Sequence, residues 1–183
     1  MDIQHLNYTE SSRYLYEFSV SEKSSVKEIA TDRKNEAKYI WIVNKADIAT
    51  EMDKGIGFLS YSIYPIPESD KAFIYIVKIH TLKEYRGETP ITINGKRVRE
   101  ILFEEIEMIE DVHKKLDIDI ITLVSANEKL DIFYQDLGFN DLPEGSVIEK
   151  YSQLIMTNDP IMYRIKQTSN LELSDEEKTI FGV

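Results

Sequence analysis

The residues whose types and spacing suggest chemistry lie in two short segments, 85–87 and 95–97. Each segment joins a glycine to at least one basic side chain, and the second comes directly before a stretch with helical periodicity. The free N–H groups at the start of a helix and the positive end of its dipole favour anions. Glycine allows the backbone to approach such a ligand closely. The pattern predicts a loop that binds a phosphate group.

A β-hairpin is the competing interpretation of the same residues. Asn94-Gly95 between β-prone residues is a strong signal for a two-residue hairpin turn. However, Val98 begins the apolar stripe of the following helix, so only two residues remain for a returning strand. We therefore expect Asn94 to be the N-cap of that helix, with Gly95 as its first residue.

The elements that must position this loop follow from the hydrophobic pattern. Apolar side chains at three- and four-residue spacing over 96–116 predict an amphipathic helix, and the apolar run at 71–82 predicts the strongest strand. Ser25 and Glu28 have the spacing of a capping box. We predict strands at 13–20, 38–45, 55–64, 71–82 and 117–125, helices at 24–34, 96–116 and 127–139, and a closing hairpin of 151–157 with 161–166. This order predicts an α/β (α+β) fold with a strand-helix-strand step in its second half.

Length and composition restrict the classes of protein that need to be considered. The 183 residues, 42% apolar and 30% charged, predict one globular domain, 1–183, with a polar C-terminal tail at 167–183. Cysteine is absent, which excludes disulfides, zinc-thiolate sites and a cysteine nucleophile. The net charge of -11 disfavours nucleic acid and anionic lipid as partners. We find no membrane-spanning run and no signal peptide, and expect a cytoplasmic protein.

Three stretches together resemble the GCN5-related N-acetyltransferase (GNAT) family. They are "IHTLKEYRG" at 79–87, "GKRVREILFEEI" at 95–106 and "SANEKLDIFYQDLGF" at 125–139. In that family a strand leads through a glycine-rich turn into a helix that holds the coenzyme A pyrophosphate. The resemblance covers residues 38–166 and implies a mostly antiparallel sheet. This chain departs from the family in its longer loop, where Ile93 stands at the place of an expected glycine.

The resemblance implies acetyl-CoA as co-substrate and a set of residues that hold it. The implied cofactor-binding residues are Thr81, Leu82, Arg86, Gly87, Gly95, Lys96, Arg97 and Asn127. For Thr81 and Leu82 the alternative role is plain sheet pairing, and for Asn127 it is a helix N-cap. Tyr134 is the implied general acid, beside the coenzyme A sulfur, and its alternative is a core aromatic next to Phe133.

The residues do not define a general base or a metal site. His80 lies near the relevant strand end, on the same face as Lys78, but a single histidine there is as readily structural. Glu51 and Asp53 precede a strand that could line the acceptor cleft, although a solvated loop is the simpler interpretation. His5 and His113 have no ligand-type partners at suitable spacing, so no metal is expected.

The predicted function is an acetyl-CoA-dependent N-acetyltransferase that acts on a primary amine of a small molecule, cationic or neutral, or of a peptide. One alternative is a non-catalytic binding or scaffold protein on the same fold, because the longer loop interrupts the expected cradle. Another is an enzyme that uses a different acyl donor. Since the final strand in this family often meets a partner subunit, the resemblance also implies that a homodimer can form.

Overall fold

The computed structural model describes residues 1–30, 37–45, 52–65, 72–87, 89–108, 120–125, 127–142 and 161–165. Two compact units divide the chain, one of residues 1–62 with 76–109 and the other of 63–75 with 110–183. Two strands, β3 and β4, contribute residues to both units, which are described separately below. The single domain expected from the sequence stays a prediction.

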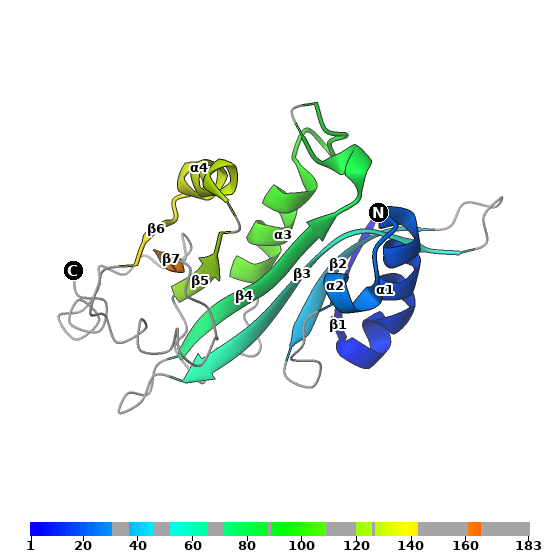
Figure 1. Cartoon of the computed structure of the whole chain (residues 1–183), viewed down its shortest axis with the longest axis horizontal. Helices are drawn as coiled ribbons and strands as arrows, with labels where there is room; N and C mark the ends of the chain where they lie inside the picture. Colours follow the sequence, from blue (N-terminus) through cyan, green and yellow to red (C-terminus); the bar gives the residue numbers. More distant parts are fainter. Residues whose placement is uncertain are drawn as a thin grey trace. The chain divides into compact units, whose positions relative to one another are not determined.

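The first unit contains a curved sheet with helices on both of its faces (Figure 1). Its strands follow the order β1-β2-β3-β4, and the first three pair antiparallel. The elements in chain order are β1 (Asp2–Asn7), α1 (Tyr8–Glu22), α2 (Val26–Ile29), β2 (Lys38–Asn44), β3 (Lys54–Pro65), β4 (Ala72–Thr81), the 3-10 turn η1 (Lys83–Tyr85) and α3 (Val98–Glu107).

Alternate residues of β2 point to opposite faces and thereby separate two cores. Trp41 faces α1, where its Nε1 donates to Ser11 Oγ at 3.0 Å and its ring lies 4.6 Å from the ring of Phe58. Neighbouring Ile42 faces α3, whose buried side chains cover this side of the sheet. The buried residues of α3 are Val98, Leu102, Phe103 and Ile106. Both cores are therefore built from one strand with period-two alternation.

The predicted strand at 13–20 is wrong, because these residues belong to α1. Tyr, Phe and Val have high β propensity, but the buried positions Ser11, Tyr14, Leu15 and Phe18 have helical spacing. The polar Ser11 concealed the start of this stripe in the sequence. Asn7 caps the helix, since its side chain accepts the N–H of Glu10 at 2.9 Å. The strand β1 before it was not predicted.

The second unit contains the start of β4 with β5 (Ile120–Val124), α4 (Glu128–Asp136), β6 (Asn140–Asp141) and β7 (Ile161–Ile165). Its strand order is β4-β5-β7-β6, and β7 pairs antiparallel with β5 and β6. Thr122 Oγ1 donates to the carbonyl of Ile74 at 3.1 Å. The predicted strand at 161–166 matches β7, whereas its expected partner at 151–157 and the tail lie outside the described residues.

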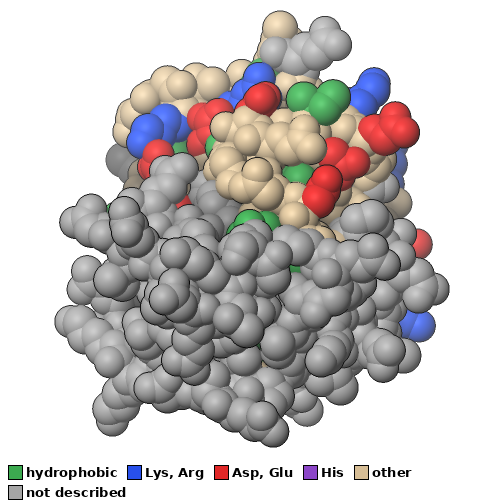
Figure 2. Space-filling model, turned by 90° about the vertical axis from the view of Figure 1, so that its left-hand side faces the viewer, with side chains coloured by type: hydrophobic (Ala, Val, Ile, Leu, Met, Phe, Trp, Pro, Cys, Tyr) green, Lys and Arg blue, Asp and Glu red, His purple; other side chains and the backbone are tan. Residues whose placement is uncertain are grey.

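The described part of one face carries acidic and basic side chains close together, with hydrophobic side chains only in small separate spots (Figure 2). The mixed, mostly antiparallel α/β fold expected from the sequence is confirmed. Among the described residues, no helix combines the length and the hydrophobicity needed to span a bilayer.

Because of a β-bulge in β3, two nearby glycines lie against opposite faces of the sheet. The pairing with β2 passes from Gly57 to Gly55, leaving Ile56 as the extra residue. A Cβ at Gly55 would lie 2.7 Å from the Trp41 ring on the α1 side. A Cβ at Gly57 would lie 2.6 Å from Cγ1 of Val98 on the α3 side and 3.1 Å from the His80 carbonyl. The first residue of α3 therefore packs directly on the backbone of β3.

This contact predicts that Gly57→Ala destabilises the fold by about 1–3 kcal/mol through overpacking. The added methyl cannot avoid both Val98 and the fixed carbonyl of His80. Urea unfolding measures the loss. The control is the same substitution in a Val98→Ala background, where the methyl has room and the loss should shrink. Additive effects of the two substitutions would contradict the contact.

Candidate functional site

The C-terminal end of β4 carries a buried hydroxyl that has no partner among the described residues. Thr81 is 1% exposed, and its Oγ1 makes no hydrogen bond within this part of the chain. The next residue, Leu82, donates its N–H to the Ile56 carbonyl at 2.9 Å and accepts the N–H of Tyr85 at 2.9 Å. Leu82 therefore continues the sheet pairing, while Thr81 retains a donor and an acceptor for a ligand.

A carboxylate at the end of α1 holds the chain as it leaves β4. Glu22 accepts the N–H of Lys83 at 3.1 Å, and its other oxygen accepts from the guanidinium of Arg86. This side chain was not singled out in the sequence, because the residues it binds are 61 and 64 positions away. The charge of Arg86, expected to face a phosphate, is paired with Glu22.

The loop after β4 folds back on itself and ends in a tight turn. Ile91 donates its N–H to the carbonyl of Glu84 at 2.8 Å. Ile93 and Lys96 exchange two backbone hydrogen bonds of 2.8 and 3.0 Å around Asn94-Gly95. Both turn residues have positive φ, 51° and 82°, as a type I′ turn requires. This is a β-hairpin reduced to a single bridged pair, so the expectation that no hairpin forms here is wrong.

The start of α3 differs from the prediction. The N-cap is Arg97 and the first helical residue is Val98, so Asn94 and Gly95 lie in the turn instead. Arginine has only donors, so it cannot cap the N–H groups of the first turn. The side chain at the N-cap therefore supplies no oxygen to this end of the helix. The N–H of Lys96 is used in the turn, and the N–H of Arg97 donates to Glu100 Oε2 at 2.8 Å.

Positive charge is concentrated in this part of an acidic chain. Residues 83–99 contain five basic side chains and two acidic ones, against a net charge of -11 for the whole sequence. Lys96 Nζ donates to both oxygens of Glu104 at 2.6 and 2.8 Å. At Gly87 and Gly95 a Cβ would meet nothing within 4 Å. The basic segment, the uncapped helix start and the Thr81 hydroxyl together suit an extended anionic ligand.

His80 packs among aromatic rings. Its ring lies 5.5 Å from that of Phe58 and 6.4 Å from that of Phe18, on the α1 side. Lys78 on the same face donates to the carbonyls of Glu28 and Ala30 at 2.5 and 3.0 Å, at the end of α2. This face of β4 is therefore covered by α1 and α2.

Burial, followed by the charges of nearby basic side chains, lowers the pKa of His80 to about 4. The three basic side chains, in order of effect, are Lys78, Arg86 and Arg99. At neutral pH the imidazole is uncharged.

Two predicted residues lie in the second unit, on α4. Asn127 is its N-cap, with Oδ1 accepting the N–H of Leu130 at 3.2 Å, as the alternative role anticipated. Tyr134 is 6% exposed, and its ring lies 5.5 Å from that of Phe133 and 6.0 Å from that of Phe139. Gly138 follows the C-cap Leu137 with a φ of 84°, a left-handed conformation that ends α4.

No group of three or more His, Cys, Asp or Glu side chains that could hold a metal ion occurs among the residues that the structure describes. Glu51 and His113 lie outside those residues, and Asp53 directly precedes β3.

The low pKa of His80 predicts that acid weakens the fold between about pH 6.5 and pH 4. In this window the unfolded chain binds a proton that the folded chain does not, so the free energy of unfolding falls as pH falls, by at most about 1.4 kcal/mol per pH unit. His80→Phe keeps an aromatic ring and removes the titration. Urea unfolding at pH 7 and pH 5 should show a smaller acid loss for His80→Phe than for the unsubstituted chain. Equal losses would contradict the buried neutral imidazole.

No protein-family model matches the sequence, and none of the curated proteins matches it either. Solved structures do share its fold. NAA60 of Arabidopsis thaliana, in complex with a bisubstrate analogue, has a TM-score of 0.55 and 13% identity, and the match covers 92% of this chain and 100% of that one. The structure of NAA60 in complex with acetyl-CoA has a TM-score of 0.54 and 12% identity. The match covers 90% of this chain and 97% of that one.

Two other solved structures are similar to the same extent. A GNAT-family acetyltransferase from Staphylococcus aureus has a TM-score of 0.55 and 15% identity, with 91% of this chain and 100% of that one covered. The KacTA–DNA complex has a TM-score of 0.56 and 14% identity, with 91% and 95% covered. At these identities the similarity establishes architecture. The chain has the fold of the GCN5-related N-acetyltransferase family.

Proposed function

We propose that the chain is an acetyl-CoA-dependent N-acetyltransferase that acts on a primary amine. One observation carries this proposal: a basic loop leads from the end of β4 to the start of α3, whose N-cap side chain makes no cap hydrogen bond. The fold around this loop is shared with NAA60 and the Staphylococcus aureus acetyltransferase. The NAA60 structures contain acetyl-CoA and a bisubstrate analogue, which supports the same donor here.

The pyrophosphate of acetyl-CoA would lie at the first turn of α3 and the loop before it. Gly87, Gly95, Lys96 and Arg97 contribute this loop, and Arg86 adds charge once a phosphate competes with Glu22 for it. The Thr81 hydroxyl, together with the backbone of Leu82, would contact the pantetheine and acetyl end of the donor. Asn127 is assigned to the pantetheine arm while it also caps α4.

In the reaction, the amine nitrogen bonds to the acetyl carbon and the carbon–sulfur bond breaks. The amine is protonated at neutral pH, with an ordinary pKa of about 10.4, so a base or a water relay must remove its proton. His80 is a weak base with its pKa near 4, which argues against it in this role. Tyr134 donates its phenolic proton to the leaving thiolate. Holding both reactants in line supplies much of the remaining rate enhancement.

The acceptor is proposed to be a cationic small molecule or a peptide amine. The net charge of -11 attracts cations and raises their association rate at low salt. The same charge disfavours nucleic acid as a partner of this chain, which stays a prediction, as do a homodimer and a cytoplasmic location.

A non-catalytic binding protein on the same fold is the second candidate. Two observations favour it. The N–H groups of Lys96 and Arg97, which were expected to face the ligand, already have partners within the chain. The Glu100 carboxylate also lies at the start of α3, where it competes with an anion for the positive helix end.

Acetyl-CoA with a panel of primary amines tests the enzyme. Since the chain has no cysteine, a thiol reagent reports only released coenzyme A. We expect turnover with at least one amine and a loss of at least about 100-fold in kcat for Tyr134→Phe, with the Kd for acetyl-CoA unchanged. Tyr16→Phe, at a side chain 64% exposed on α1, is the matched control.

If coenzyme A is released only at the background rate with every amine, the proposed activity is wrong. The binding-protein alternative is then examined by calorimetry. A ligand present at 100 times its Kd should raise the free energy of unfolding by about 2.7 kcal/mol. Acetyl-CoA that neither reacts nor stabilises the chain would leave only the architecture in common with the family.

The pairing of Arg86 with Glu22 predicts opposite effects of neutralising its two members. Glu22→Gln retains an oxygen for the Lys83 N–H but releases the guanidinium, so acetyl-CoA should bind a few-fold more tightly, as expected for up to about 1 kcal/mol. Arg86→Gln should weaken binding. Titration calorimetry of both variants measures this. If both weaken binding equally, the pair holds the loop in place and does not compete with phosphate.

A further inference from the structure

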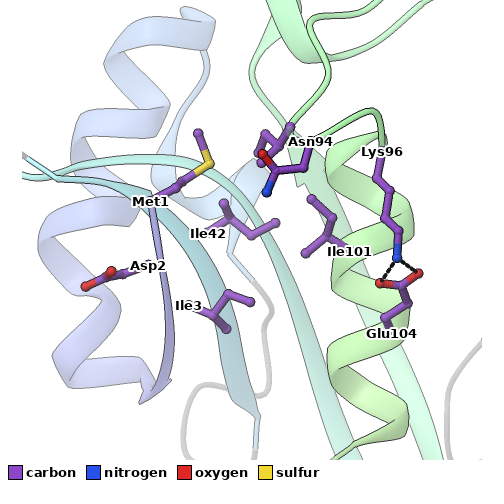
Figure 3. A pocket seen from close by; sticks show the side chains of 9 residues that line it. Met1, Asp2, Ile3, Ile42, Asn94, Lys96, Ile101 and Glu104 are labelled. Carbon is purple, nitrogen blue, oxygen red and sulfur yellow. Dashed lines mark hydrogen bonds and ion pairs between the residues drawn. The ribbon is translucent and has the colours of Figure 1, made fainter.

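The first unit contains a pocket with a volume of about 360 Å³. It lies on the α3 face of the sheet, beside the edge strand β1 (Figure 3). Residues of β1, β2, the turn at 93–96 and α3 line it. Small-molecule sites typically have volumes of roughly 300–1,000 Å³, so the pocket is large enough for a small ligand.

The floor of the pocket is aliphatic. Ile3, Ile42 and Ile101 point toward one another around it (Figure 3). Ile42 is buried in the sheet opposite Ile3, yet Ile3 remains 39% exposed because α3 does not extend over this corner. None of the lining side chains that the structure describes is aromatic. Such a floor favours a short, branched hydrocarbon chain, since burial of each CH₂ group stabilises by about 0.8 kcal/mol.

The charged side chains around the pocket are already paired. Lys96 and Glu104 bond to each other at 2.6 and 2.8 Å on its α3 side (Figure 3). Asp2 pairs with Lys45 at 2.7 Å, and its side chain points away from the isoleucines (Figure 3). A ligand with a net charge would have to compete with one of these pairs, whereas a neutral ligand leaves both intact.

Among the described lining residues, Asn94 supplies the uncharged polar side chain. Its side-chain amide lies at the mouth of the pocket above Ile42 and Ile101 (Figure 3). Within the described part of the chain this amide makes no hydrogen bond. It offers two N–H donors and a carbonyl acceptor side by side. The group that matches both at once is another carboxamide.

We propose that this pocket binds a small neutral amide with a branched aliphatic chain. The chain would lie on Ile3, Ile42 and Ile101, and the carboxamide would pair with Asn94. The proposal does not depend on the enzymatic function, because all of its contacts lie in the pocket itself.

The turn makes the contribution of the Asn94 amide measurable. Asn94 has a φ of 51°, a conformation that asparagine and glycine tolerate better than other residues. Asn94→Gly therefore removes the amide and keeps the turn. A second variant, Ile3→Trp, fills the pocket from its exposed side.

A consequence for regulation rests on the proposed function. Ile93, Asn94 and Lys96 belong both to the pocket and to the loop proposed to hold acetyl-CoA. An amide that stabilises this turn would change the affinity for acetyl-CoA, and acetyl-CoA would change the affinity for the amide by the same factor.

Three probes with the same branched chain test the pocket without acetyl-CoA: 3-methylbutanamide, 3-methylbutanoate and 3-methylbutylamine. NMR spectra of isoleucine methyl groups report binding at pH 7. We expect saturable shifts with the amide and a Kd at least about fivefold lower than for either charged probe, as one hydrogen bond of about 1 kcal/mol provides. Asn94→Gly should abolish this preference, and Ile3→Trp should weaken all three probes. Ile132→Trp, on exposed α4, is the control.

The proposal is overturned if no probe gives saturable shifts, if a charged probe binds most tightly, or if Asn94→Gly retains the preference for the amide. Because these titrations contain no acetyl-CoA, they decide on the pocket even if the chain proves not to be an acetyltransferase. Repeating the amide titration with saturating acetyl-CoA then tests the coupling alone.

Discussion

The packing of Val98 on Gly57 is the constraint on which the candidate site depends. The space between the first residue of α3 and the backbone of β3 has no room for a methyl group, since a Cβ would lie 2.6 Å from Val98. This contact sets where α3 begins relative to the end of β4, where Thr81 and Leu82 lie. The bulge at Ile56 brings Gly57 to this face and leaves Gly55 for Trp41 on the other. The positions of both flanking helices thus depend on an irregularity of one strand.

The basic loop carries its own counter-charges. Glu22 pairs with Arg86, Glu104 pairs with Lys96, and Glu100 accepts the N–H of Arg97. In an acidic chain this arrangement lowers the cost of concentrating five basic residues between positions 83 and 99. A phosphate that binds to Arg86 or Lys96 would therefore have to exchange partners with a carboxylate. Exposed ion pairs contribute at most about 1 kcal/mol each, so such an exchange requires little energy.

Much of the frame of the site could be predicted from the sequence. The strand before the loop, the stripe from Val98 to Ile106 and the cap at Asn127 follow from local periodicity and capping chemistry, and the structure confirms them. The exact start of α3 could not be predicted. Asn94-Gly95 fits both a cap and a type I′ turn, and the backbone bonds between Ile93 and Lys96 favour the turn. The segment 13–20 was mistaken for a strand because its helical stripe begins with a serine.

The sequence by itself determined the class of fold, the order of the elements from β2 to α4 and the loop in which basic residues and glycines are concentrated, because hydrophobic period and turn chemistry act over a few neighbouring residues. Only the tertiary structure decided that Glu22 binds Arg86, that the buried Thr81 hydroxyl has no partner among the described residues and that Asn94 borders an aliphatic pocket. These features join residues up to 64 positions apart, or depend on which neighbouring groups surround a side chain in the folded protein. Their physical basis is burial and distance between segments, which no local pattern in the chain encodes.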